Sequence, residues 1–527
     1  MKYIKTIGFT LLLLALALSG YYYYQKNNPK TIAVVLFDDF TLLDVVGAYQ
    51  TFSGLIFKNY QFLFVSAKPG VVQAGGGQSL IATHGFNQVK SANILYVPGS
   101  GHIGHALAND SLLAWIRSID QTTAQTTAVG SGTLLLAKAG LLEGREAAAH
   151  FYNKVELEAL GAKFVNKNYV VSGKYYTGSG TSASIDMVLQ LIDDLEGEWQ
   201  SKATQLFIAY DPAPPVQSGT FEEADTSVLH LAQRMAQESP VDTAREPKTI
   251  AMLLYEGFTM LDVTGPFQVF NELKPLGYEM VFVSKTGGRI MSDYLLDLST
   301  TQSFKTLKEA DILFIPGGSR TFQAMADSAT MAWVTSINGG TQWTTTVCTG
   351  SLVLGQAGFL MGRQATSHWY TGSLLEKFGA TYSHGRYTKD GKYITGAGVS
   401  SGIDLALMVV KELAGENYAK AIQLKLGYHP APPHDTGSPE KTEQDIVDVL
   451  SKMYERSIPK EIPVIGKSSG VKGARVIDPV CKMDVSNGAV DSVTYKGVEY
   501  KFCSAGCKKL FESEPDMVLA SMKPHVK

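Results

Sequence analysis

Hydrophobic and polar positions alternate with two different periods along the second half of the chain. Short apolar runs rich in β-branched residues predict strands at Thr249–Leu254, Glu279–Ser284, Asp311–Ile315 and Trp343–Val347. Between these runs apolar residues recur at helical spacing, as in Leu261–Leu273. Strands that alternate with helices predict a parallel sheet covered by helices on both faces, with ligand sites at the carboxyl ends of the strands.

The same pattern occurs twice. Between Leu43 and Pro215, short motifs recur 218 positions later, for example Asp44 as Asp262, Pro98-Gly99 as Pro316-Gly317, and His150 as His368. An unbroken register of this length predicts a duplicated domain rather than a short solenoid repeat. Each copy ends in a predicted helix, and a charged linker joins the two copies; these segments are Ser227–Gln237, Asp445–Tyr454 and Glu238–Lys248.

Composition and charge exclude few classes of protein. The chain has 527 residues, 45% of them hydrophobic, and a formal net charge of −3, which describes a globular protein of about three domains. It has no long basic run and no helix-turn-helix pattern after either copy, so nucleic acid is not an expected partner. The cysteines are too few for a disulfide framework and favour a lone thiol and a metal site: Cys348, Cys481, Cys503 and Cys507.

The first 30 residues form a separate segment. Two lysines precede a long apolar run, and four tyrosines follow it. The stretch Ile4–Tyr24 is long enough to span a bilayer, and the tyrosines are typical of an interfacial aromatic belt. We therefore predict that residues 1–30 are a signal anchor, a single transmembrane helix that holds the other domains outside the cytoplasm. A cleaved signal peptide, processed at Ala15–Ala17, is the alternative.

One turn in the second copy indicates chemistry. Cys348 follows the predicted strand Trp343–Val347 and precedes apolar residues at helical spacing. A cysteine at such a turn lies beside unpaired N–H groups at the positive end of a helix dipole, which lowers the pKa of the thiol. A buried structural thiol is the alternative, because free cysteine is among the most buried residue types.

The first copy lacks this thiol. The position equivalent to Cys348 is Gly130, followed by Ser131. Asp44 and His150 are present, but a carboxylate and an imidazole without a thiol cannot perform covalent catalysis. We therefore predict that the first copy is a pseudoenzyme domain.

Both copies resemble the DJ-1/PfpI family, which has the flavodoxin-like fold of class I glutamine amidotransferases. The pattern within that family is most similar to isonitrile hydratases and to a domain of some AraC-type regulators. The resemblance implies two flavodoxin-like, doubly wound parallel-sheet α/β domains in tandem, at 31–240 and 241–458. It also implies that the first domain imitates the family's dimer partner and forms an intramolecular pseudo-dimer. The segments that carry it in the second copy are Leu261–Pro266, Ile315–Gly318, Val347–Gly350, Gly396–Asp404 and Tyr428–Pro433.

The resemblance also implies a set of catalytic residues. Cys348 would be the nucleophile, Asp262 the proton donor and acceptor, and Thr349 the residue that orients the reacting group. The N–H groups of Gly318 and Thr349 would form an anion hole. His368 would either accept the thiol proton or be a packed structural histidine. For Asp262 the alternative is a first-turn carboxylate of its helix.

The function implied is that of a membrane-anchored cysteine enzyme similar to isonitrile hydratase. Its thiolate would add to a small-molecule substrate and water would release the product, with no metal or organic cofactor at the cysteine. A non-catalytic extracytoplasmic sensor of a ligand, stress or metal is the alternative, which the degenerate first copy favours. His429 replaces the acid that the first copy keeps as Asp211, so we expect an altered pocket rim. Asp404 is expected to cap a helix.

The end of the chain is a third unit. After a linker rich in Lys, Gly, Ser and Pro at 459–474, residues 475–527 resemble a YHS domain, a small zinc-ribbon-like module. Three thiolates suit zinc or copper(I), with Met483 as a further copper ligand. Unmetallated thiols, or a disulfide within the last pair, are the alternatives. The predicted metal ligands are Cys481, Cys503 and Cys507.

Overall fold

The computed structural model describes most of the two repeated domains and part of the C-terminal module. The predicted anchor up to residue 28, most of the predicted linker at 459–474, and Cys481 and Met483 lie outside the described residues. Among the residues that are described, no helix is both long and apolar enough to cross a membrane. The described residues are 29–55, 58–236, 246–293, 296–460, 462, 478–480, 485, 491–496, 498–513 and 515–520.

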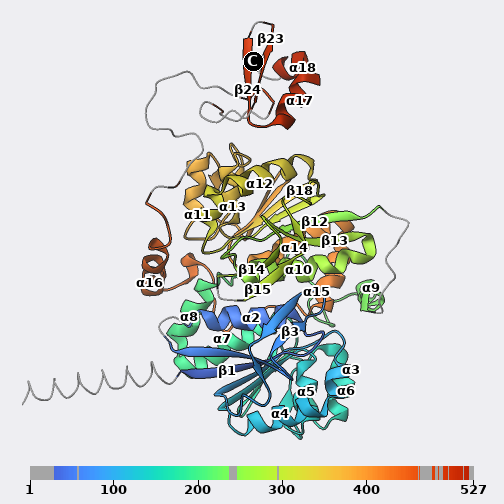
Figure 1. Ribbon diagram of the computed structural model, residues 1–527. Coiled ribbons are helices and arrows are strands. Elements are labelled where there is room, and N and C mark those ends of the chain that lie inside the picture. Colours follow the sequence, from blue (N-terminus) through green and yellow to red (C-terminus); the bar gives the residue numbers. More distant parts are fainter. Residues whose placement is uncertain are drawn as a thin grey trace, which may run out of the picture.

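Each copy contains one seven-stranded sheet between two layers of helices (Figure 1). In both sheets every strand pairs in parallel with its neighbours except one edge strand, which is antiparallel. The first sheet has the order β10 (Tyr169–Ser172), β11 (Tyr175–Gly178), β7 (Gln125–Val129), β6 (Ile94–Val97), β1 (Lys30–Val35), β2 (Tyr60–Ser66), β5 (His84–Gly85). The second has the order β16 (Gln302–Ser303), β13 (Tyr278–Ser284), β12 (Lys248–Leu253), β17 (Ile312–Ile315), β18 (Trp343–Val347), β22 (Tyr393–Gly396), β21 (Tyr387–Asp390).

The predicted elements agree with the structure in type, and most of them differ from it at their ends. The strand before Cys348 has the predicted bounds. The predicted helix Leu261–Leu273 is shorter: α10 (Met260–Phe270) is followed by a 3-10 turn that contains Pro275. Proline has no N–H to donate and disfavours α-helical backbone before it. The predicted linker ended at Lys248, which is wrong, because Lys248 begins β12 and pairs with Tyr278.

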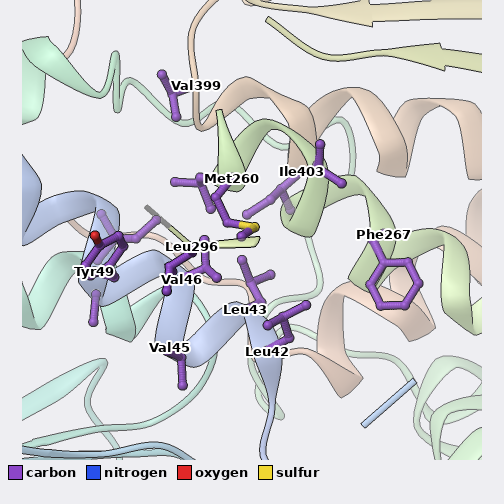
Figure 2. Close-up of a cluster of buried hydrophobic side chains, with 14 of the residues drawn as sticks. Leu42, Leu43, Val45, Val46, Tyr49, Met260, Phe267, Leu296, Val399 and Ile403 are labelled. Atoms are coloured by element: carbon purple, nitrogen blue, oxygen red, sulfur yellow. The ribbon is translucent and has the colours of Figure 1, made fainter. Parts of the chain in front are cut away.

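The two copies pack against each other through helices on facing sides of their sheets (Figure 1). Helix α2 (Leu42–Ser53) of the first copy contacts α10 of the second, and behind them lie α7 (Ala183–Glu196) and α14 (Ser401–Ala414). Figure 2 shows the buried cluster at this contact, where side chains of the first copy meet those of the second. Removing these apolar side chains from water stabilises the contact. Side chains labelled there include Leu42, Leu43, Val46, Met260 and Ile403.

Polar contacts across this interface come in pairs that are related by the 218-residue offset. Asp186 accepts a hydrogen bond from the N–H of Ala431 at 2.9 Å, and Asp404 accepts one from the N–H of Ala213 at 3.1 Å. Such reciprocity is the property of an isologous, two-fold contact. Two serine hydroxyls form a second reciprocal pair, Ser182 to the Gly427 carbonyl (3.1 Å) and Ser400 to the Ala209 carbonyl (2.9 Å).

The last helix of each copy packs on the other copy. Helix α9 (Thr226–Ala236) contacts α15 (Glu416–Lys425), and α16 (Gln444–Glu455) contacts α8 (Glu198–Phe207) (Figure 1). Helix α16 thereby joins the second copy to the first at the end of the interface where Cys348 lies.

Asp404 is not a helix cap, contrary to the expectation. It lies in the first turn of α14, after the N-cap residue Ser400. Its fully buried carboxylate pairs with the Arg386 guanidinium at 2.7 Å and accepts the Tyr428 hydroxyl at 2.8 Å. Asp404 is therefore part of a buried polar network at the interface.

The described part of the C-terminal module is a β-hairpin followed by two helices. Strands β23 (Asp491–Tyr495) and β24 (Val498–Phe502) pair antiparallel, and α17 (Ala505–Ser513) and α18 (Pro515–Ala520) follow. The fully buried rings of Phe502 and Phe511 lie 5.2 Å apart and form its small core. The zinc-ribbon-like architecture stays a prediction, because the segment around its first cysteine lies outside the described residues.

Candidate active site

Cys348 occupies a strained turn between β18 and α13 (Gly350–Gln356). Its φ is +58°, in the left-handed region that costs a non-glycine residue about 1–2 kcal/mol. Such strain at a strand-to-helix turn is typical of nucleophile sites, because it directs the side chain out at the end of the sheet. The thiol is nearly buried, with 6% of the residue exposed. The predicted turn at Cys348 is therefore confirmed.

Asp262 lies beneath this turn, in the first turn of α10. Its carboxylate oxygen Oδ2 accepts the N–H of Gly317 at 2.8 Å, and the residue is completely buried. Burial raises the pKa of Asp262 well above its ordinary value, while hydrogen bonds to Gly317 and to the Cys348 thiol partly offset this rise. The carboxyl group therefore keeps its proton to a higher pH than an exposed aspartate does, and it hydrogen-bonds the Cys348 thiol.

The thiol of Cys348 has a raised pKa, opposite to the lowered pKa that the turn predicted. Burial is the largest cause, and the neighbouring Asp262 adds to it; hydrogen bonds from Thr349 lower the pKa by less. The turn does supply the expected N–H group, but the loss of water around the sulfur outweighs its effect. Because its pKa lies above the already basic ordinary value of a thiol, Cys348 is protonated in the resting site at neutral pH.

One of the two N–H groups of the predicted anion hole is occupied by a side chain. The N–H of Gly318 donates to the Thr349 hydroxyl at 3.0 Å, and that hydroxyl lies 2.6 Å from the Thr321 hydroxyl. Thr349 is thus held by the Gly318 loop, and a substrate anion would displace or share its hydroxyl. Glycine is required at 318 by close backbone packing, because a Cβ there would lie 2.2 Å from the Gly257 carbonyl oxygen.

His368 reaches the same pocket as Cys348, but its imidazole is directed elsewhere. Its Nδ1 accepts the N–H of Tyr370 at 3.4 Å, and the ring also hydrogen-bonds the Phe207 carbonyl of the first copy. Burial lowers the pKa of His368 to about 4, so the ring is neutral at pH 7. Within the described residues no hydrogen bond joins it to the Cys348 thiol, which favours the packed histidine of the two alternatives.

A pocket of about 490 Å³ lies in front of Cys348. Its walls come from both copies and from α16 with the turn after it. Sequence analysis missed most of these residues, because they are far apart in the chain. His429, which was expected at the rim, is not among the lining residues and lies near Glu223 instead. The lining from the first copy is Gln50, Ser53, Leu55 and Phe207, and that from α16 and its turn is Met453, Tyr454, Ser457 and Ile458.

Asp293 is a second acidic residue in this pocket that sequence analysis missed. It accepts the Thr259 hydroxyl at 2.6 Å, and its charge raises the pKa values of Asp262 and Cys348. The 218-residue register contained a signal for it, because the equivalent position in the first copy is Gly75. An acid present only in the copy with the thiol was a candidate site residue.

The first copy keeps the frame of the site without the sulfur. Gly130 has the same φ of +58° as Cys348. Asp44 accepts the N–H of Gly99 at 2.9 Å, as Asp262 does from its glycine, and burial raises the pKa of Asp44 to about 7. A Cβ on Gly130 would meet Asp44 Oδ2 at 3.9 Å and no closer atom. A Cβ at position 130 is therefore not excluded by close contacts, and the lost thiol removes the nucleophile from an otherwise similar turn.

Two of the predicted metal ligands lie together with a third residue that was not predicted. The sulfur atoms of Cys503 and Cys507 are 3.5 Å apart, and a carboxylate oxygen of Asp478 lies within 4.8 Å of both. Asp478 is buried and accepts the N–H of Cys503 at 2.7 Å. Two thiolates and a carboxylate suit zinc, so the described donors fit the expected metal. Cys481 lies outside the described residues.

Comparison with known proteins identifies the family of both copies and of the C-terminal module. The sequence model of the DJ-1/PfpI family matches residues 30–194 and again 248–412. The chain belongs to the DJ-1/PfpI family. The YHS domain model matches residues 476–520. Both parts of the predicted resemblance are thus confirmed.

Similar individual proteins cover one or both copies. Isonitrile hydratase from Pseudomonas putida is 38% identical over 203 residues, which are 38% of this chain and 88% of that protein. Protein DJ-1 homolog A from Arabidopsis thaliana is 22% identical over 345 residues, 63% of this chain and 81% of its own. A crystal structure of a ThiJ/PfpI family protein from Pseudomonas syringae shares 35% identity, covers 40% of this chain and 87% of its own, and has a TM-score of 0.39.

Proposed function

We propose that the second copy is a cysteine enzyme that hydrates isonitriles, and that the first copy is its intramolecular partner in place of a second subunit. The observation that carries the proposal is the strained thiol of Cys348 beside the buried carboxyl group of Asp262, whose pKa burial raises well above its ordinary value. The 38% identity with an isonitrile hydratase supports the choice of substrate class. The reciprocal contacts between the copies support the role of the first copy.

The proposed reaction begins with addition of the thiol to the terminal isonitrile carbon. The sulfur forms the S–C bond while Asp262 donates its proton to the same carbon, and one C–N π bond breaks. Asp262 then takes the thiol proton, so the net change is addition of S–H to the carbon. The product of this half-reaction is a thioimidate on Cys348. The raised pKa values of both groups favour the protonated forms that this step needs.

Water completes the reaction. It adds to the thioimidate carbon, the nitrogen is protonated, and the C–S bond breaks with return of a proton to the sulfur. The product is an N-substituted formamide, and no oxidant or reductant is consumed. Thr349, held by the Gly318 loop, orients the reacting group, and His368 positions the wall of the pocket through the Phe207 carbonyl.

The test is hydration of a simple alkyl isonitrile by the purified protein, with formamide followed by NMR. We expect turnover by the wild type and loss of at least about a thousandfold in Cys348→Ala, because the covalent step is removed. Gly130→Cys in the Cys348→Ala background is expected to fold without restoring turnover. Absence of turnover in the wild type, with Cys348 still alkylated by iodoacetamide, would overturn the isonitrile assignment.

A second function is favoured by the cluster in the YHS domain. We propose that Asp478, Cys503 and Cys507 take part in binding one zinc or copper(I) ion. The purified full chain is expected to retain about one equivalent of Zn²⁺ after dialysis, measured by elemental analysis. Cys503→Ser with Cys507→Ser should lose this equivalent, while Cys348→Ser, which changes a distant thiol, should keep it. Wild-type protein without bound zinc or copper would contradict the proposal.

A further inference from the structure

The copy without a thiol forms part of the wall in front of Cys348. Gln50 and Ser53 line the pocket from the last turn of α2, Leu55 follows them, and Phe207 lines it from the end of α8. If the first copy acted only as a dimer partner, its residues would need only to stabilise the interface. These residues do more, because they face the space that a substrate of Cys348 would occupy.

Phe207 connects the first copy to two other walls of the pocket. Its carbonyl accepts the Tyr454 hydroxyl at 3.1 Å and also hydrogen-bonds His368. The rings of Phe207 and Tyr454 are nearly parallel, with 10° between their planes and 6.2 Å between their centroids. Phe207 itself is 9% exposed, so its position is determined by packing. The aromatic wall is therefore built before any ligand binds.

Part of the pocket lining has no equivalent around the empty turn of the first copy. Four apolar or aromatic lining residues have counterparts 218 positions away that are smaller, more polar or charged, whereas other lining residues, such as Leu55 and Tyr370, have identical counterparts. The interface is otherwise reciprocal, so two-fold packing does not require this difference. It indicates that the apolar wall serves the site with the thiol. The pairs are Phe207 and Lys425, Tyr454 and Ala236, Phe322 and Gly104, and Val399 and Thr181.

The chemistry of the lining selects a class of ligand. Among the described lining residues none is Lys or Arg, His368 is neutral, and Asp293 is the acidic one. An anionic ligand would therefore lose its hydration without gaining a charged partner. Four aromatic side chains face a space of about 490 Å³, within the range of sites that bind drug-sized molecules. A small alkyl isonitrile would fill little of it.

We propose that the pocket binds uncharged molecules with an aromatic ring, and that Phe207 and Tyr454 hold the ring while the reactive carbon faces Cys348. The proposal deepens the proposed function and rests on it for the identity of the reactive group. Recognition of the ring by the first copy is separate from isonitrile hydration. It can therefore be measured with a reagent that reacts with the thiol alone.

The experiment compares two alkylating reagents, iodoacetamide and N-benzyl iodoacetamide, on the full chain. Each forms an S–C bond and releases iodide and the thiol proton, and mass spectrometry of peptides follows every cysteine separately. We call the ratio of the alkylation rates with the benzyl reagent and with iodoacetamide the ring preference of a cysteine. We expect the ring preference of Cys348 to be about tenfold larger than that of Cys503 and Cys507, because the ring is buried against aromatic side chains. A benzyl reagent with a 4-carboxylate should lose this preference.

Variants assign the preference to the first copy. Phe207→Ala should reduce the ring preference of Cys348 about tenfold, to the value of the C-terminal cysteines. Phe207→Leu should keep part of this preference, and it replaces the alanine variant if that variant does not fold. Phe221→Ala removes an exposed phenylalanine of the same copy that does not line the pocket, so it should have no effect. Equal preference in wild type and Phe207→Ala, or equal reaction of the carboxylated reagent, would overturn the proposal. Ring preference without formamide turnover would overturn only the isonitrile assignment.

Discussion

Replacing Asp262 by asparagine is expected to lower kcat/KM for isonitrile hydration by about 10²–10⁴. Asparagine keeps the size of the side chain and an oxygen for the Gly317 N–H, but it cannot give a proton to the substrate carbon or take one from the thiol. The loss should appear in kcat, because the proton moves in the transition state. The measurement is steady-state formation of formamide by the wild type and the variant.

The pH profile gives a second measure of the same residue. Burial raises the pKa of Asp262, and the active form carries this proton, so wild-type activity should fall as pH rises through that raised pKa. Asp44→Asn is the matched control: it changes the equivalent buried carboxyl of the first copy and should leave kcat/KM unchanged. Equal activity of the wild type and Asp262→Asn would assign proton transfer to another group.

Replacing Arg386 by alanine is expected to destabilise the protein by about 3–5 kcal/mol. The guanidinium is 10% exposed and pairs with the fully buried Asp404, and it also donates to the Ala209 carbonyl of the first copy at 2.7 Å. Without it a buried carboxylate loses its charged partner. Urea unfolding of the full chain measures the loss. The matched control is Arg363→Ala, whose partner Asp390 is partly exposed and whose loss should stay below about 1 kcal/mol.

In the first copy the carboxylate equivalent to Asp404 is that of Asp186, which has no arginine partner among the described residues. Asn168 replaces Arg386 there, donates to Asp186, and burial raises the pKa of Asp186 to about 7. A raised folded-state pKa means that stability is lost as pH increases toward that value. Arg386→Ala should therefore lose more stability at pH 8 than at pH 5, and Arg386→Asn should lose less than the alanine variant. Equal losses in Arg386→Ala and Arg363→Ala would show that the buried pair contributes little.

The sequence alone was sufficient to predict the duplicated α/β fold and the position of the thiol. Strand and helix periods are local properties, since each depends on which side of the chain faces a core. The predicted strand Trp343–Val347 has the same bounds as β18 for this reason. The 218-residue register then showed that Gly130 replaces Cys348, and the structure gives both residues the same φ. The turn is determined by a few neighbouring residues, so it was accessible without tertiary contacts.

The tertiary structure determined the burial, the charged partners and the pocket environment of these residues. The direction of the Cys348 pKa shift depends on how much water the fold removes, and the local turn predicted the opposite direction. Local sequence suggested that Asp404 caps its own helix, but Asp404 pairs with Arg386, which lies just before β21. The pocket wall combines Phe207 with Tyr454, which are 247 positions apart. Burial, ion pairing and pocket shape all depend on contacts between distant segments, and no local pattern records them.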